Sequence, residues 1–195
     1  MLSRVEDFMI KFVMCAKRHP NLSRTEFQYM QDMILLRPIS VEDIAAIKSW
    51  PVYVDGFEQM DYALREHGWL DEFWQKPDTW IYIAELNRQV IGFSLLSTTS
   101  EGAAEFRIAI HPLWTGKGLG KKITVATLKT GFRQLKLNRV HLIVRKNNSR
   151  AAKLYENLEF AYIGESIHMI QGKRIEFKDM AMTRQKFNNL DAEED

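Results

Sequence analysis

Three alternating glycines lie between a short apolar segment and a long amphipathic one. The stretch from 108 to 121 reads IAIHPLWTGKGLGK. Because glycine has no Cβ, backbone N–H groups in such a loop can approach a ligand closely, and the helix start behind the loop adds the positive end of its dipole. This chemistry is typical of a cradle for phosphate or pyrophosphate. The residues that would form the cradle are Thr115, Gly116, Lys117, Gly118, Leu119, Gly120 and Lys121.

Several kinds of loop use alternating glycines. A P-loop requires four residues between its glycines and then Gly-Lys-Ser/Thr, which this segment lacks. A dinucleotide-binding loop requires Gly-x-Gly-x-x-Gly and an acidic residue after the next strand. Here the spacing differs, and the next predicted strand, 140–144, is followed by Arg145 and Lys146. Coenzyme A is the third ligand class, and a flexible turn that binds nothing is the alternative.

A second patterned segment runs from 148 to 160 and reads NSRAAKLYENLEF. Asn148 is a good helix N-cap, since its side-chain oxygen can accept a hydrogen bond from the first turn. Together the two segments resemble the acetyl-CoA site of the GNAT acetyltransferase superfamily, whose patterns are Arg/Gln-x-x-Gly-x-Gly/Ala and Asn-x-x-Ala-x-x-Leu-Tyr-Glu-x-x-Gly-Phe. Gly118 and Gly120 match the first pattern. The second pattern is matched by Asn148, Ala151 and Tyr155.

The chain departs from these patterns at two positions. Thr115 stands where Arg or Gln is usual, which weakens the expected contacts to pyrophosphate, although Lys117 and Lys121 can supply charge. Glu159 replaces the glycine that shapes a helix end in the family. The resemblance covers about 34–186 and is nearest to the branch that holds the spermidine and ribosomal-protein alanine acetyltransferases. The features similar to that branch are Leu36-Arg37-Pro38, Glu42-Asp43, Ala104–Arg107 and Gly172.

The resemblance implies an N-acetyltransferase that moves an acetyl group from acetyl-CoA directly to a primary amine in a ternary complex. In the family, backbone N–H groups on the strand before the loop polarise the thioester carbonyl, and Ile108 and Ile110 match those positions. The resemblance also implies that Asn148 contacts the pantetheine arm and that Tyr155 protonates the leaving thiolate. A phenol with a pKa of ~10 is protonated at neutral pH, although a tyrosine that only packs is the alternative. Glu105 is the candidate general base, with a solvated residue at a strand start as its alternative.

The acceptor is suggested by the stretch from 53 to 78, which is rich in acidic and aromatic side chains and holds only Arg65 and Lys76 as bases besides His67. Charge and cation–π attraction would together favour a cationic amine, such as a polyamine, an amino sugar or a basic peptide N-terminus. A solvated acidic face over buried rings is the alternative. The acids are Asp55, Glu58, Asp61, Glu66, Asp71, Glu72 and Asp78, and the aromatic residues are Tyr53, Phe57, Tyr62, Trp69, Phe73 and Trp74.

The elements that must position these residues follow from the hydrophobic periodicity. Their order, with strands and helices mixed along the chain, predicts an α/β (α+β) fold in which a mixed sheet of six to seven strands carries helices on both faces. The GNAT resemblance adds a splay between the two central strands. The predicted strands are 33–37, 80–85, 90–96, 104–110, 140–144, 161–170 and 174–183, and the main predicted helices are 119–135 and 148–158.

Composition limits the remaining possibilities. The chain has 195 residues, a formal charge of +2 and 46% hydrophobic residues, which is ordinary for a globular domain. We expect a helical extension over 1–32, the GNAT domain over 33–187 and an acidic tail over 188–195. The charge does not favour a nucleic-acid partner, and the apolar stretch 8–16 is too interrupted for a signal peptide or membrane span. Cys15 is the single cysteine, so we expect no disulfide, no metal and a cytoplasmic setting.

Two other functions are compatible with the sequence. A GNAT-fold protein can bind an acyl-CoA as a sensor or scaffold without turnover, and the departures at Thr115 and Glu159 leave that function open. Tyr155 and Asn148 argue for turnover instead. An interaction module whose loop binds nothing is the third function. The extension over 1–32 is compatible with packing on the domain, with a homodimer interface or with the acceptor mouth.

Overall fold

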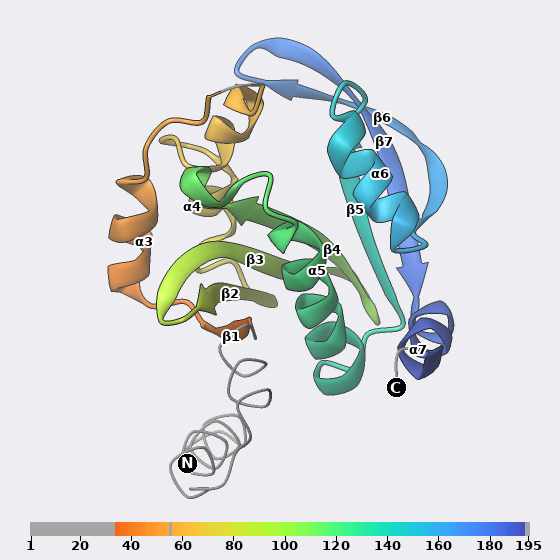
Figure 1. Ribbon diagram of the computed structural model, residues 1–195. Helices are drawn as coiled ribbons and strands as arrows, with labels where there is room; N and C mark the ends of the chain where they lie inside the picture. Colours follow the sequence, from red (N-terminus) through yellow and green to blue (C-terminus); the bar gives the residue numbers. More distant parts are fainter. Residues whose placement is uncertain (1–33, 55, 194–195) are drawn as a thin grey trace, which may run out of the picture. The chain divides into compact units, whose positions relative to one another are not determined.

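The computed structural model describes residues 34–54 and 56–193 (Figure 1). The predicted helical extension over 1–32 therefore lies outside the described residues. None of the helices in the described ranges is long and apolar enough to span a membrane.

Seven strands form one mixed sheet in the order β1-β2-β3-β4-β5-β7-β6. All neighbours are antiparallel except β4 and β5, which run parallel. The fold class expected from the sequence is confirmed. The strands are β1 Leu35–Pro38, β2 Thr79–Leu86, β3 Gln89–Ser100, β4 Ala103–Ile110, β5 Arg139–Arg145, β6 Ala161–Ile170 and β7 Lys173–Thr183.

The two central strands separate after a short contact, as the resemblance implied. Only Ala103–Glu105 of β4 pair with residues of β5, and their partners are Arg139–His141. Beyond that point β4 continues to Ile110 and β5 to Arg145 without pairing with each other, and Figure 1 shows the two strands diverging. Backbone groups that a continuous sheet would pair are therefore left facing the gap.

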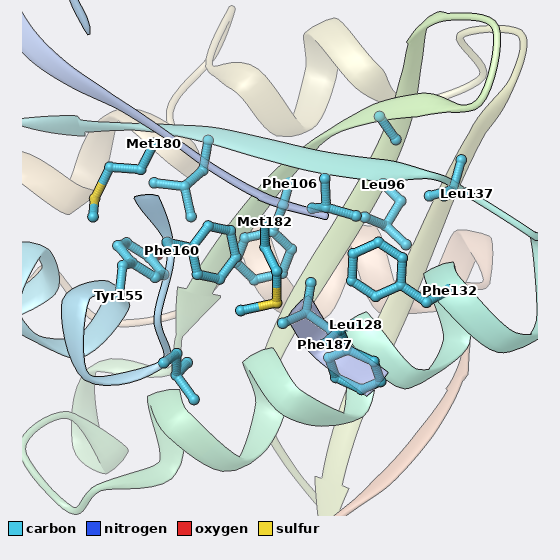
Figure 2. Close-up of a cluster of buried hydrophobic side chains, with 14 of the residues drawn as sticks. Leu96, Phe106, Leu128, Phe132, Leu137, Tyr155, Phe160, Met180, Met182 and Phe187 are labelled. Atoms are coloured by element: carbon cyan, nitrogen blue, oxygen red, sulfur yellow. The ribbon is translucent and has the colours of Figure 1, made fainter. Parts of the chain in front are cut away.

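Helices cover both faces of the sheet. Strand β3 is buried on both faces, which explains its almost continuous apolar run instead of a strict alternation. One core lies between the sheet and the helices that follow β4, and Figure 2 shows its side chains. A second lies under the helices that precede β2, and a third, smaller one joins the start of α5, Leu119–Lys129, to β2, β3 and the end of β4. The first group of helices is α5, the π turn η3 Thr130–Gln134, α6 Ser149–Asn157 and α7 Arg184–Glu193; the second is α3 Val41–Lys48, η1 Glu58–Ala63 and α4 Trp69–Phe73.

The C-terminal helix differs from expectation. Helix α7 runs through positions 188–193, which the sequence analysis assigns to an acidic tail. Its anchor is Phe187, which is 4% exposed and lies 5.1 Å from the ring of Phe132. Arg184 donates from Nε to the carbonyl oxygen of Leu137 at 2.7 Å and so ties the helix start to the chain before β5. One buried aromatic and one arginine are too weak a pattern for periodicity to detect.

An ion pair between β1 and α3 stabilises the folded chain, and acidic pH removes this stabilisation. Arg37 donates to both carboxylate oxygens of Asp43, at 2.6 and 2.8 Å, and to Glu85 at 2.7 Å. Asp43 also closes a capping box with Ser40, and Arg37 lowers the pKa of Asp43 to about 2.

We therefore expect the contribution of this pair to the free energy of unfolding to be constant above about pH 5 and to be lost as pH falls from about 4 to about 2, because in that range the unfolded chain binds a proton that the folded chain does not. With allowance for screening at this partly exposed site, the loss amounts to about 1–2 kcal/mol. Urea unfolding at several pH values measures the effect. Asp43→Asn should flatten this part of the profile; a variant with the same acid dependence as the native chain would contradict the assignment.

Candidate active site

A cleft of about 820 Å³ lies where β4 and β5 separate. Cavities of this size are typical of small-molecule and cofactor sites. One side is formed by the glycine loop and by the first turns of α5 and α6. The opposite side is formed by η1, α4 and the last residues of β6, 168–170, so segments far apart in the sequence meet across the gap.

The glycine loop has the backbone expected of a phosphate cradle. Gly116 and Gly118 both have φ near +76°, a conformation that residues with a Cβ rarely adopt. A Cβ built on Gly118 meets no atom within 4 Å, so the space beside it is open to the cleft. Thr115 donates from Oγ1 to the carbonyl oxygen of Pro112 at 2.8 Å and closes the short helix η2, Pro112–Trp114. Thr115 thus has a structural role at the position where the family uses Arg or Gln.

Two helix N-termini and several cations meet at this side of the cleft. The side chain of Asn148 caps α6 by accepting from the Ala151 N–H at 3.1 Å. Lys121, Arg150 and Lys153 also line the cleft. Lys117 does not, and its ammonium lies 4.4 Å from the ring centre of Trp114 instead. Dipole ends and cations together suit a pyrophosphate group. All the other predicted cofactor residues line the cleft: Ile108, Ile110, Thr115, Gly116, Gly118, Leu119, Gly120, Lys121, Asn148, Ala151 and Tyr155.

The end of β4 presents backbone donors to the gap. The His111 N–H donates to the carbonyl oxygen of Ile91 on β3, and the Ala109 carbonyl also points to β3, against Gly92. Backbone groups alternate in direction along a strand. The N–H groups of Ile108 and Ile110 therefore point away from β3, towards the splay, where β5 no longer pairs with them.

A buried tyrosine fixes the last residue of β4. Tyr53 is 2% exposed and donates from its hydroxyl to the carbonyl oxygen of Ile110 at 2.6 Å. The Ile110 carbonyl has no partner on β5, and the Tyr53 hydroxyl takes that place. The bond fixes the end of β4 but leaves the N–H groups of Ile108 and Ile110 facing the gap.

We expect Tyr53→Phe to lower the free energy of unfolding by about 1–2 kcal/mol, because it leaves a buried carbonyl without its partner. Chemical denaturation measures this loss. Tyr82→Phe is the matched control, since the Tyr82 hydroxyl makes no hydrogen bond with the described residues although burial raises its pKa to about 12. Equal stability losses in the two variants would show that the Tyr53 hydrogen bond contributes nothing.

Tyr155 faces the cleft from α6 within a rigid aromatic group. Its ring meets Phe106 and Phe160 edge-on, with centroids 6.4 and 5.6 Å away, and Figure 2 shows the three rings among the core side chains. Burial raises the pKa of the Tyr155 phenol above its ordinary value. The phenol therefore stays protonated across the physiological range and remains a proton donor.

Glu105, the predicted base, is not brought to the cleft. It lies at the last position of β4 that pairs with β5, and its carboxylate accepts a hydrogen bond from Arg107 Nε at 2.8 Å. Among the described residues that line the cleft, Glu72 on α4 is the only carboxylate. Sequence reasoning placed Glu72 within the acidic stretch but had no signal to single it out, because α4 is short and its orientation depends on tertiary packing.

Most of the acidic stretch serves local structure instead of the cleft. Asp61 pairs with Arg65 at 2.7 Å and accepts from the Tyr53 N–H. Asp71 pairs with Lys48 at 2.6 Å. Asp55 lies outside the described residues, and of the six other predicted acids only Glu72 lines the cleft. Three of the predicted aromatic residues do line it, namely Phe57, Tyr62 and Trp69.

Comparisons with known proteins agree with this geometry. A model of the acetyltransferase (GNAT) domain matches residues 33–161. The spermidine N(1)-acetyltransferase of Escherichia coli K12 is 40% identical over 65 residues, which cover 33% of this chain and 35% of that enzyme. The chain thus spans about a third of the length of this relative.

Solved structures match over more of the chain. A chimaera built from the Vibrio cholerae spermidine N-acetyltransferase has a TM-score of 0.68 at 23% identity and covers 81% of this chain and 99% of its own. A dodecameric structure of the Vibrio cholerae enzyme has a TM-score of 0.64 at 22% identity and covers 81% and 98%. At this identity the likeness concerns the fold. Since the domain model covers most of the chain, the protein belongs to the acetyltransferase (GNAT) domain family.

Proposed function

We propose that the protein transfers an acetyl group from acetyl-CoA to a primary amine. The observation that carries this proposal is the splay itself, in which the free N–H groups of Ile108 and Ile110 and the protonated Tyr155 line one cleft behind a glycine cradle. The family relationship and the names of the relatives support the same reaction.

The chemistry follows from these positions. The neutral amine attacks the thioester carbon, a C–N bond forms, and the C–S bond breaks with its electron pair remaining on sulfur. The β4 N–H groups stabilise the negative charge that develops on the carbonyl oxygen. Tyr155 donates a proton to the departing thiolate, and the proton lost by the amine passes to Glu72 or to water.

The decisive measurement is thiol release from acetyl-CoA in the presence of polyamines, amino sugars, amino acids and peptides. We expect turnover with one class of amine. No turnover with any amine, while acetyl-CoA still raises the melting temperature, would favour a non-catalytic acyl-CoA sensor or scaffold. Absence of both signals would favour an interaction module.

A second copy of the chain is the macromolecular partner that we propose. The dodecameric Vibrio cholerae relative supports self-association, as do the exposed apolar side chains along β6, namely Tyr162, Ile163, Ile167 and Met169. The mass of the purified chain in solution tests this, and a monomer at all concentrations would contradict it.

A further inference from the structure

The side of the cleft away from the glycine loop is cationic, although the preceding acidic stretch suggested the reverse. Helices α5 and α6 cover one face of the sheet, where Val140, Leu142 and Val144 of β5 are buried in the core. Side chains alternate along a strand, so Arg145 at the end of β5 points to the opposite face. It lines the cleft there together with Arg107 of β4.

Arg107 is held in place by its neighbours. Its Nε donates to Glu105 at 2.8 Å, and its guanidinium carbon lies 4.7 Å from the ring centre of Phe73 on α4. The charge of Arg107 is thus matched by Glu105, while its terminal nitrogens make no hydrogen bond within the part of the chain that the structure describes. This explains why Glu105, the predicted base, is unavailable for proton transfer.

Arg145 is different, because its guanidinium makes no hydrogen bond or ion pair with any residue of the ranges 34–54 and 56–193. It is partly buried, and Tyr62 on η1 lies close enough to influence it electrostatically. Burial also lowers its pKa. A guanidinium that has lost part of its hydration and has no carboxylate partner is unfavourable in the free protein, and an incoming anion would relieve that cost.

We infer that the acceptor carries an anionic oxygen group, a carboxylate or phosphate, on the same molecule as the amine, and that Arg145 binds this group. The planar guanidinium presents paired N–H donors that match such oxygens. Glu72, which lines the same cleft from α4, provides the opposite charge for the ammonium end of the same molecule before that end loses its proton. A zwitterionic acceptor therefore complements this side of the cleft, whereas a polyamine would place cations beside Arg145. This inference rests on the proposed acetyl transfer for its chemistry.

The test compares ligands that differ in one charged end. γ-Aminobutyrate and putrescine have the same number of carbon atoms, and phosphoethanolamine distinguishes phosphate from carboxylate. Binding of each to the protein saturated with coenzyme A is measured by calorimetry, which requires no turnover. We expect one or both anionic amines to bind about ten- to a hundredfold more tightly than putrescine, as is usual for a hydrogen-bonded charge pair.

Variants at Arg145 identify the group responsible. Arg145→Gln should remove the preference for the anionic amines, and Arg145→Glu should reverse it in favour of putrescine, with the affinity for acetyl-CoA unchanged in both. Arg88→Gln, at an exposed turn between β2 and β3, is the control and should leave the preference intact. Equal or undetectable binding of all three ligands, tighter binding of putrescine, or a preference that survives Arg145→Gln would overturn the inference.

The same ligands in the thiol-release assay separate this inference from the proposed function. Binding that depends on Arg145, without turnover of any amine, would contradict acetyl transfer and retain the anion site. Turnover that favours putrescine would retain acetyl transfer and overturn the anion site.

Discussion

Tyr155→Phe is expected to lower kcat for acetyl transfer by about a hundredfold or more, with little change in the affinity for acetyl-CoA. The substitution removes one hydroxyl from a ring that Phe106 and Phe160 hold in place, so packing is retained while the proton donor is lost. Positioned general acids contribute about a hundred- to ten-thousandfold to rates. Steady-state kinetics of thiol release, with calorimetric binding of acetyl-CoA, distinguish a chemical loss from a binding loss.

The control for this experiment is Tyr162→Phe, which removes the hydroxyl of an exposed tyrosine on β6. It should leave kcat within about twofold of the native value. Because burial raises the pKa of Tyr155, its deprotonation should not cause a fall in kcat at pH values up to about 10. An unchanged kcat in Tyr155→Phe would mean that the thiolate leaves without this donor and that the tyrosine only packs.

Gly118→Ala should weaken acetyl-CoA binding at least tenfold. Two causes act together: the backbone must keep φ at +76°, which costs a residue with a Cβ about 1–2 kcal/mol, and the new methyl enters the space that opens on the cleft. Gly118→Asn separates the two causes, since asparagine tolerates this conformation better than alanine but also fills the space. If blocking dominates, both variants lose affinity.

Gly172→Ala is the matched control for the backbone cost. Gly172 lies in the turn between β6 and β7, has φ at +73°, and its Cβ would also meet no atom within 4 Å. We expect a similar loss in the free energy of unfolding for Gly172→Ala and Gly118→Ala, but no loss of acetyl-CoA affinity for Gly172→Ala. Equal affinity for acetyl-CoA in the native chain and Gly118→Ala would refute the cradle.

The sequence was sufficient to predict the parts that depend on local pattern. Strands β2 to β7 and helices α5 and α6 lie within a few residues of their predicted positions, because each has a clear apolar period and a turn at its end. The glycine loop and the Asn148 cap were predictable for the same reason, since their roles depend on backbone conformation and nearby hydrogen bonds. The prediction for the 119–135 helix did not foresee its π turn.

The acceptor side could not be predicted, because it depends on which face of each element meets the gap. The sequence does not distinguish Glu105 from Glu72, since both are glutamates in mixed surroundings. In the structure, Glu105 pairs with Arg107, whereas Glu72 lines the cleft. Arg145 followed a strand and served in the sequence analysis only to exclude a dinucleotide loop. Its position at the cleft could be predicted only with the knowledge that β5 no longer pairs with β4 at Arg145.

The departure at Glu159 is an instance where a family pattern predicts conformation better than residue type. Glu159 has φ at +62°, the left-handed conformation that glycine adopts most readily, so the helix end keeps its shape without glycine. The Phe160 N–H still donates to the Tyr155 carbonyl, and Lys186 on α7 forms an ion pair with the Glu159 carboxylate. The turn that was in question is thus retained, and with it the position of Tyr155.

The short contact between β4 and β5 also bears on how long the protein survives in a cell. Three residue pairs join β4 to β5, so beyond Glu105 and His141 the two parts of the sheet, each paired within itself, are held to one another by packing and not by β4–β5 bonds. A ligand lying in the splay adds its binding free energy to that of the folded state. If the proposed function holds, the rate at which proteases degrade the chain should therefore fall as the acetyl-CoA concentration rises, so that the abundance of the protein would follow the supply of this cosubstrate.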